Sequence, residues 1–126
     1  MLSAKAGFSG FSVNDLAKAK DFYTGTLGLK LIDDAMGLRL ALPGGSGETW
    51  IYPKDDHQPA TYTNLNFVVA DIKEAVSELT GQGVKFEQYE GTTDEQGIAY
   101  GKERNMGPNI AWFKDPAGNI LALIEE

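Results

Sequence analysis

The chain has 126 residues, of which 42% are hydrophobic and 23% are charged, the composition of one ordinary globular domain. It contains no cysteine, which excludes disulfides, thiolate metal sites and a cysteine nucleophile. The net charge of −7 argues against a nucleic-acid partner, because phosphate binding needs clustered Lys and Arg. We find neither a membrane-length apolar run nor a leader-like segment at residues 1–7, so we expect a cytoplasmic protein with no membrane contact.

The first half of the chain predicts a strand, a helix and three further strands. Alternating apolar residues predict a strand over residues 8–13, and Asp15 stands where a helix N-cap is expected. Apolar residues then recur at helical spacing until Gly28, which predicts the end of the helix. Short apolar runs predict strands over residues 29–32, 38–42 and 49–52, with glycine-containing turns between the later ones.

The second half repeats this order after a polar connector at residues 55–61. A strand is predicted over residues 63–69, and Asp71 followed by Glu74 forms a capping-box pattern for the next helix. The helix carries a clean apolar stripe and is stopped by glycines. Further strands are predicted over residues 84–89, 98–102, 110–114 and 120–124, which is one strand more than in the first half.

A short internal repeat links the two halves. Val13, Asp15 and Ala19 return as Val69, Asp71 and Ala75, with an offset of 56 residues each time. Such a repeat indicates two copies of one supersecondary unit that must pack together to bury their apolar faces. We predict an α+β fold of two β-α-β-β-β modules, at about residues 1–54 and 62–126, with the helices on one face of mostly antiparallel sheets.

Two segments at opposite ends of this doubled pattern read FSVNDLAKAKDFYTGTLGL, residues 11–29, and AWFKDPAGNILAL, residues 111–123. Together they resemble the vicinal oxygen chelate superfamily, which includes glyoxalase I, bleomycin-resistance proteins, fosfomycin-resistance enzymes and extradiol dioxygenases. The resemblance covers nearly the whole chain. It implies mixed sheets that curl around a cleft shared by the two modules, helices on the convex face, and a homodimer.

The resemblance also indicates where the metal enzymes of this superfamily hold a divalent ion. Its ligands lie seven residues before the Asp that opens each helix and four residues after the Gly of each closing turn. These positions hold Phe8, Asn64, Ala122 and, to within a residue or so, Ile51. Three of these side chains cannot ligate, and Asn64 offers one neutral amide oxygen, so we expect no metal site and no cofactor.

The expected ligand is therefore a small organic molecule held in the cleft between the modules. Its expected lining comes from the side chains that face away from the helices and from the vacated ligand positions: Phe8, Ser12, Ile51, Asn64, Asn66, Trp112 and Ala122. The phenyl ring of Phe8 favours an uncharged group at its end of the cleft. The choice between a cation-binding trap and a general apolar binder stays open at this stage.

Several other polar groups have two interpretations. The only histidine, His57, follows Asp55 and Asp56 in the connector, and we interpret it as a solvated residue because neighbours in a loop rarely converge on one ion. Arg39 either points to the surface or pairs with an anionic ligand group. Residues 100–108 form either a mobile flap or an ordinary hairpin loop.

Three functions remain open. The first is a metal-independent binding protein of the resistance or carrier type. The second is a glyoxalase- or dioxygenase-type enzyme with a relocated metal or with metal-free acid–base chemistry, for which Tyr100 is the candidate base. The third is an interaction module whose cleft is filled by its own side chains.

Overall fold

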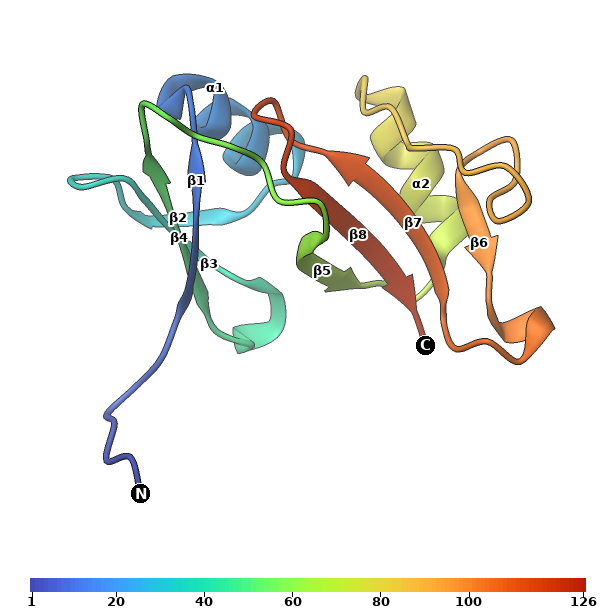
Figure 1. Cartoon of the computed structure of the whole chain (residues 1–126), viewed down its shortest axis with the longest axis horizontal. Coiled ribbons are helices and arrows are strands. Elements are labelled where there is room, and N and C mark those ends of the chain that lie inside the picture. The colour runs from blue at the N-terminus through green and yellow to red at the C-terminus, as the bar shows by residue number, and fades with distance from the viewer. The chain divides into compact units, whose positions relative to one another are not determined.

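The computed structural model describes residues 1–126 and divides the chain into two compact units, Met1–Gln58 and Pro59–Glu126. Each unit contains one four-stranded sheet, and each sheet combines parallel with antiparallel pairs (Figure 1). The predicted α+β fold of two similar modules is confirmed. No helix in the chain has the length and apolar character needed to cross a membrane.

The first unit follows the predicted order of elements. Its strands are β1 (Ser9–Val13), β2 (Lys30–Asp33), β3 (Leu38–Ala41) and β4 (Glu48–Pro53). They lie side by side in the order β1-β4-β3-β2. β1 is parallel to β4, whereas β3 is antiparallel to both of its neighbours. The parallel pair requires the chain to cross over after β1, and the helical segment supplies this crossover.

This helical segment is not a uniform α-helix. It begins as α1 (Leu16–Lys20) and continues as a π-helix, η1 (Asp21–Thr26). The Asp15 carboxylate accepts a hydrogen bond from the backbone N–H of Lys18 at 3.1 Å, which confirms the predicted N-cap. The segment stops at Gly28, whose φ of 70° belongs to the left-handed region that glycine adopts at helix ends.

One face of the first sheet is buried under this helical segment. The ring of Tyr23 is fully buried and lies 6.0 Å from the ring of Phe11 on β1. Val13, Leu40 and Ile51 are also fully buried, and they belong to the same alternating set as Phe11. The opposite face, which we call the open face of the first sheet, carries the alternate side chains: Phe8, Gly10, Ser12, Arg39, Glu48, Trp50 and Tyr52.

The second unit has the same plan. Its elements are β5 (Thr63–Val68), α2 (Ile72–Gly81), β6 (Ile98–Tyr100), β7 (Asn109–Lys114) and β8 (Ile120–Glu125). The strand order is β5-β8-β7-β6, with β5 parallel to β8, and α2 packs on β7 and β8 (Figure 1). Asp71 is confirmed as the N-cap of α2, because its carboxylate accepts a hydrogen bond from the N–H of Glu74 at 3.1 Å.

Two predicted strands of this unit differ from the structure. Residues 84–89 are not a strand, because Phe86 forms only a single bridge to Phe113 of β7 before the chain turns away at Tyr89. The strand predicted over residues 98–102 ends at Tyr100. The chain turns at Gly101, where a Cβ atom would lie 2.3 Å from the carbonyl oxygen of Pro108.

Candidate ligand-binding site

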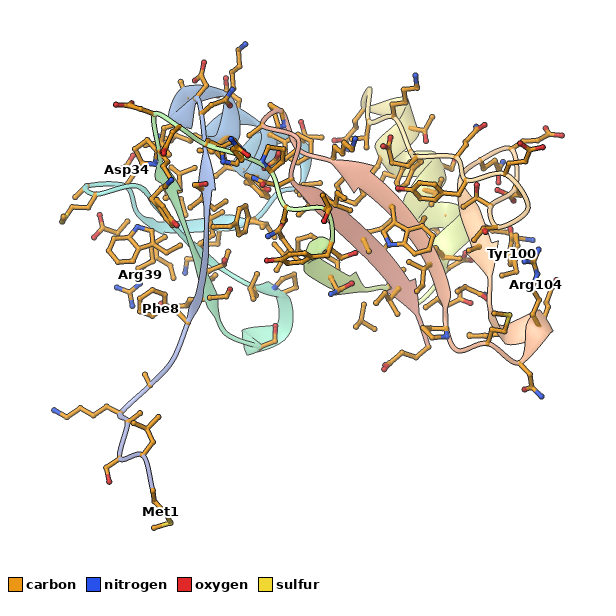
Figure 2. The ribbon with its side chains drawn as sticks, in the orientation of Figure 1. Met1, Phe8, Asp34, Arg39, Tyr100 and Arg104 are labelled. Carbon is orange, nitrogen blue, oxygen red and sulfur yellow. The ribbon has the colours of Figure 1, made fainter.

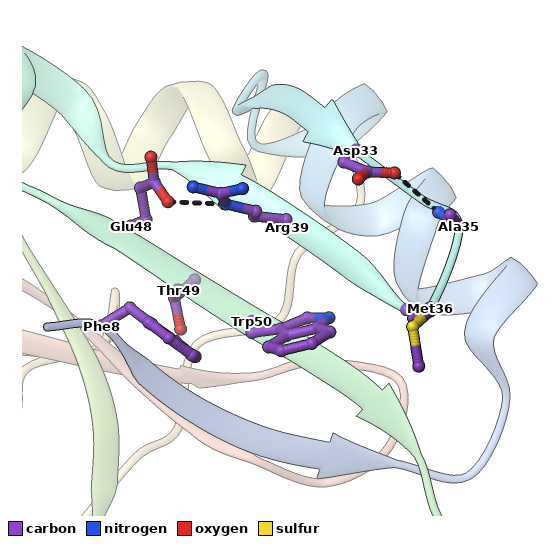
Figure 3. Close-up of a pocket in the computed structure, with 9 residues that line it drawn as sticks. Phe8, Asp33, Ala35, Met36, Arg39, Glu48, Thr49 and Trp50 are labelled. Carbon is purple, nitrogen blue, oxygen red and sulfur yellow. Dashed lines mark hydrogen bonds and ion pairs between the residues drawn. The ribbon is translucent and has the colours of Figure 1, made fainter. Parts of the chain in front are cut away.

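The open face of the first sheet carries a pocket of about 340 Å³ (Figure 3). Its apolar wall consists of Phe8, Trp50 and Met36, and the rings of Phe8 and Trp50 lie 5.6 Å apart at 54° to each other. Phe8 and Met36 are 63% and 78% exposed, although large apolar side chains are usually buried. Exposed aromatic and thioether groups around a hollow are typical of a site that binds an organic molecule.

The polar side chains of the pocket come from neighbouring strands. Arg39 of β3 donates from Nε to Glu48 Oε1 of β4 at 2.7 Å, and both residues line the pocket. Asp33 of β2 also lines it, and its carboxylate accepts the backbone N–H of Ala35 at 2.8 Å. Two positions were left open for Arg39, the surface and the binding site. The structure places its side chain at the pocket, beside Glu48 (Figure 3).

Asp33 reaches the pocket through an irregularity in the pairing of β2 with β3. Lys30 pairs with Ala41 and Leu31 with Leu40, but the register then shifts and Asp33 pairs with Arg39. Such a bulge turns a side chain toward the other face of a sheet. Because Ile32 is the extra residue, the carboxylate of Asp33 takes the place beside Arg39.

The structure brings Ser12 and His57 together, which the sequence analysis did not predict. Ser12 Oγ and His57 Nδ1 lie 2.6 Å apart, and both side chains are partly buried. His57 is therefore not the solvated connector residue that we expected, because its side chain is partly buried and contacts Ser12. It holds the end of the first unit against the open-face side chain of β1.

The pairing register corrects the position of Ile51. Gly10 pairs with Trp50 in the first sheet, and Asn66, which follows Gly10 by the repeat offset of 56 residues, pairs with Ala122 in the second. The counterpart of Ala122 is therefore Trp50. Ile51 is fully buried on the helix-covered face.

The remaining predicted residues lie together in the second sheet, on the face opposite the one that carries the buried Phe113 and Leu121; we call it the open face of the second sheet. Ala122 of β8 stands between Asn66 of β5 and Trp112 of β7 in the strand register. Asn64 precedes Asn66 by two residues on β5, and its amide oxygen is buried without a hydrogen-bond partner. These four residues are thus neighbours within the second sheet, and none of them is part of the lining of the first unit's pocket.

Tyr100 does not share that face. It pairs with Asn109, whereas its neighbour Ala99 pairs with Ile110 in the open-face set, and Lys73 of α2 lies 5.6 Å from its ring centroid. Burial raises the pKa of Tyr100 above its ordinary value of 10.0, and Asp94 raises it further. A tyrosine base requires a lowered pKa, so neither its position nor its electrostatics suits the predicted role.

The loop after Tyr100 is a hairpin connection between the antiparallel strands β6 and β7, and Figure 2 labels Tyr100 and Arg104 in this part of the chain. It contains a short 3-10 turn, η3 (Lys102–Arg104). The N–H of Lys102 donates to Asn109 Oδ1 at 3.2 Å, and Arg104 donates to the carbonyl oxygen of Gly91 at 3.2 Å. These bonds fit the hairpin interpretation of residues 100–108 better than the flap.

The placement of the His, Asp and Glu side chains argues against a metal site. No group of three or more His, Cys, Asp or Glu side chains gathers where it could hold an ion. At the positions that the sequence resemblance indicates, with Trp50 in place of Ile51 according to the strand register, Phe8, Trp50 and Ala122 provide no ligating atom, and Asn64 provides a single amide oxygen. This set does not fit a divalent ion, because such sites need several carboxylate or imidazole donors.

Comparison with known proteins identifies the family. The model of the glyoxalase/bleomycin resistance protein/dioxygenase superfamily matches residues 7–123. The chain belongs to this superfamily. The match includes both sheets and the whole pocket, so the superfamily scaffold here carries an aromatic pair, Phe8 and Trp50, in the first module. No sequence among the curated proteins matches the chain significantly.

Several solved structures share the fold along nearly the whole chain. A member from Sphaerobacter thermophilus is 26% identical over 100% of both chains, with a TM-score of 0.72. An antibiotic-binding protein from a Streptomyces species is 24% identical, with a TM-score of 0.72 and coverage of 99% of this chain and 98% of its own. A fosfomycin-resistance protein from Listeria monocytogenes is 19% identical, with a TM-score of 0.70 and coverage of 100% and 95%.

Proposed function

We propose that this protein is a metal-independent binding protein that holds a small organic molecule in the pocket on the open face of the first sheet. The observation that carries the proposal is the pocket itself, with an apolar wall made of the exposed Phe8 and Met36 and the half-buried Trp50. Its volume of about 340 Å³ lies at the lower end of the range for small-molecule sites, which is roughly 300 to 1,000 Å³. The proposed ligand therefore contains a single ring or two fused rings.

The chemistry of the pocket supports binding rather than metal catalysis. Phe8 stands where the metal enzymes of the superfamily carry a ligand, and its ring adds an apolar surface in place of a donor. One of the structural neighbours is an antibiotic-binding protein, which shows that this fold serves as a binding scaffold. A sequestering, resistance or carrier role follows for this chain, with the ligand bound and released unchanged.

The test is calorimetric titration with bicyclic aromatic compounds, together with the Phe8→Ala variant. Removal of one exposed ring from the wall should weaken binding by about 1 to 2 kcal/mol, which corresponds to a loss of roughly five- to thirtyfold in affinity. Tyr62→Ala is the matched control, because Tyr62 is similarly exposed, at 69%, and does not line the pocket. Equal affinities of the two variants would contradict the proposed site.

Metal independence has a separate test. Titration with Zn²⁺, Mn²⁺ and Ni²⁺ should give no binding in the micromolar range, and a chelator should leave the affinity for the organic compound unchanged. A tight ion whose binding is lost in Asn64→Ala would overturn the proposal, because Asn64 is the only vacated position with an oxygen donor.

A second candidate function is metal-free acid–base catalysis on the same face. The observation that favours it is the contact between His57 Nδ1 and Ser12 Oγ at 2.6 Å, which provides an imidazole base next to a hydroxyl group. Turnover of a glyoxalase- or dioxygenase-type substrate that survives a chelator and is lost in His57→Gln would select this function.

The predicted homodimer and the predicted cytoplasmic location stay predictions. Sedimentation velocity tests the homodimer.

A further inference from the structure

We infer that the pocket selects flat aromatic molecules that carry a positive charge; this inference rests on the proposed function. It departs from the expectation of an uncharged group beside Phe8. The reason is that the structure places acidic side chains around the same aromatic wall, and the sequence pattern did not bring them together.

The aromatic wall is suited to a cation. The rings of Phe8 and Trp50 are tilted by 54° at a centroid distance of 5.6 Å, and both residues line the pocket. The faces of aromatic rings, and of indole above all, attract positive charge through their quadrupole. A ring system that bears an ammonium group gains this attraction in addition to the burial of its apolar surface.

The charged side chains of the pocket add up to a net negative site. Two carboxylates, Asp33 and Glu48, and one guanidinium, Arg39, line it. Arg39 and Glu48 compensate each other through their contact at 2.7 Å. Asp33 makes no ion pair, and its carboxylate accepts a hydrogen bond from the N–H of Ala35 at 2.8 Å. The uncompensated charge of the pocket is therefore the carboxylate of Asp33.

An anionic ligand meets two obstacles at the same place. It has to compete with Glu48 for Arg39, and the uncompensated carboxylate of Asp33 lines the same pocket. Because like charges within one pocket repel, the net effect disfavours an organic anion of the same shape. The overall charge of −7 acts in the same direction, although salt screens it over a distance of about 8 Å at physiological ionic strength.

The experiment uses one ring system in three charge states. The ligands are 2-naphthylmethylammonium, 2-naphthalenemethanol and 2-naphthoate, titrated into the full chain at low and at high salt. Binding is followed by calorimetry and by the indole N–H signal of Trp50 in two-dimensional NMR, assigned with a Trp50→Phe variant. We expect the cation to bind roughly tenfold more tightly than the alcohol at low salt, and the anion to bind most weakly.

Two substitutions localise the effect. Asp33→Asn should lower the affinity for the cation by about threefold and leave that for the alcohol unchanged, because the amide oxygen can still accept the N–H of Ala35. Asp34→Asn is the matched control: Asp34 is the next residue, pairs with Lys20 at 3.0 Å and does not line the pocket.

The outcomes separate this inference from the proposed function. If the three ligands bind equally, or the naphthoate binds best, selection for cations is wrong and the pocket remains a binding site. If Asp33→Asn and Asp34→Asn weaken the cation to the same extent, the carboxylate of Asp33 does not supply the selectivity. If none of the ligands shifts the Trp50 signal, the pocket does not hold bicyclic rings, and the proposed function fails together with the inference.

Discussion

Gly37 offers a direct test of the geometry of the pocket, because it lies in the lining with no room for a side chain. Its φ is 117°, and a Cβ atom added there would lie 2.7 Å from the carbonyl oxygen of Ile51 and 3.0 Å from Nε1 of Trp50. The first of these atoms belongs to the backbone of the central strand β4, which is held on both sides by neighbouring strands. It cannot move aside without disturbing the sheet.

The cost of Gly37→Ala has two parts. A residue with a side chain loses about 1 to 2 kcal/mol in a left-handed conformation. The contact with the Ile51 oxygen adds the cost of an overpacked site, about 1 to 3 kcal/mol. We therefore expect a loss of about 2 to 5 kcal/mol in the free energy of unfolding, and a weaker affinity for aromatic ligands because the indole of Trp50 has to shift.

Urea unfolding followed by circular dichroism measures this loss, and Gly44→Ala is the matched control. Gly44 also has a positive φ, of 68°, but a Cβ atom there would have no neighbour within 4 Å. The control should lose only the conformational part, about 1 to 2 kcal/mol, and keep its ligand affinity. If both variants are equally stable and bind equally well, Gly37 is not packed against Trp50 and the described pocket is wrong.

Three further predictions concern the elements that hold the units in shape. Asp71→Ala should cost about 1 kcal/mol in urea unfolding, because the first turn of α2 loses its cap. The pKa of Glu125 lies below its usual 4.5, because the N–H of Ile72 and the Lys102 ammonium bind its carboxylate; the stability advantage of the wild type over Glu125→Gln should therefore shrink as the pH falls below 4.5, and a constant difference between pH 7 and pH 3 would contradict this. A double-mutant cycle with Ser12→Ala and His57→Gln should give a coupling of about 0.5 to 1.5 kcal/mol, whereas additive losses would mean that the contact contributes nothing.

The order of elements was predictable because it depends on local signals. Asp15 and Asp71 cap their helices as expected, since an N-cap aspartate needs only the N–H three residues ahead of it. Alternation within the strand predicted over residues 8–13 likewise agrees with the structure, in which Phe11 and Val13 are buried and Ser12 between them is on the other face. The same reasoning also predicted a strand over residues 84–89, which the structure does not contain. Their composition is typical of a strand, but a strand also needs a partner edge, and only Phe86 finds one.

The error at Ile51 shows why spacing alone did not locate the site. The two closing turns differ in length, so glycine is not the common reference point. In the first turn the N–H of Leu42 donates to the carbonyl of Gly47, and in the second the N–H of Asp115 donates to the carbonyl of Asn119. Gly47 therefore corresponds to Asn119 rather than to Gly118. Counting from these bonds leads to Trp50 in place of Ile51, and a shift of one residue exchanges the two faces of a strand.

The charge of the pocket also depends on strand register, here the register between β2 and β3. Regular pairing of β2 with β3 would have placed Ile32 opposite Arg39, and the pocket would then have been apolar with one compensated ion pair. The register shift between Leu31 and Asp33 substitutes an acid at that place. Since a bulge depends on how two strands meet, the sequence of β2 alone did not reveal it. Deletion of Ile32 should give regular pairing with Asp33 still opposite Arg39, so the preference for the naphthylmethylammonium cation over the neutral alcohol should persist. Loss of the preference in this variant would show that the position of Asp33 opposite Arg39 does not set the charge of the pocket.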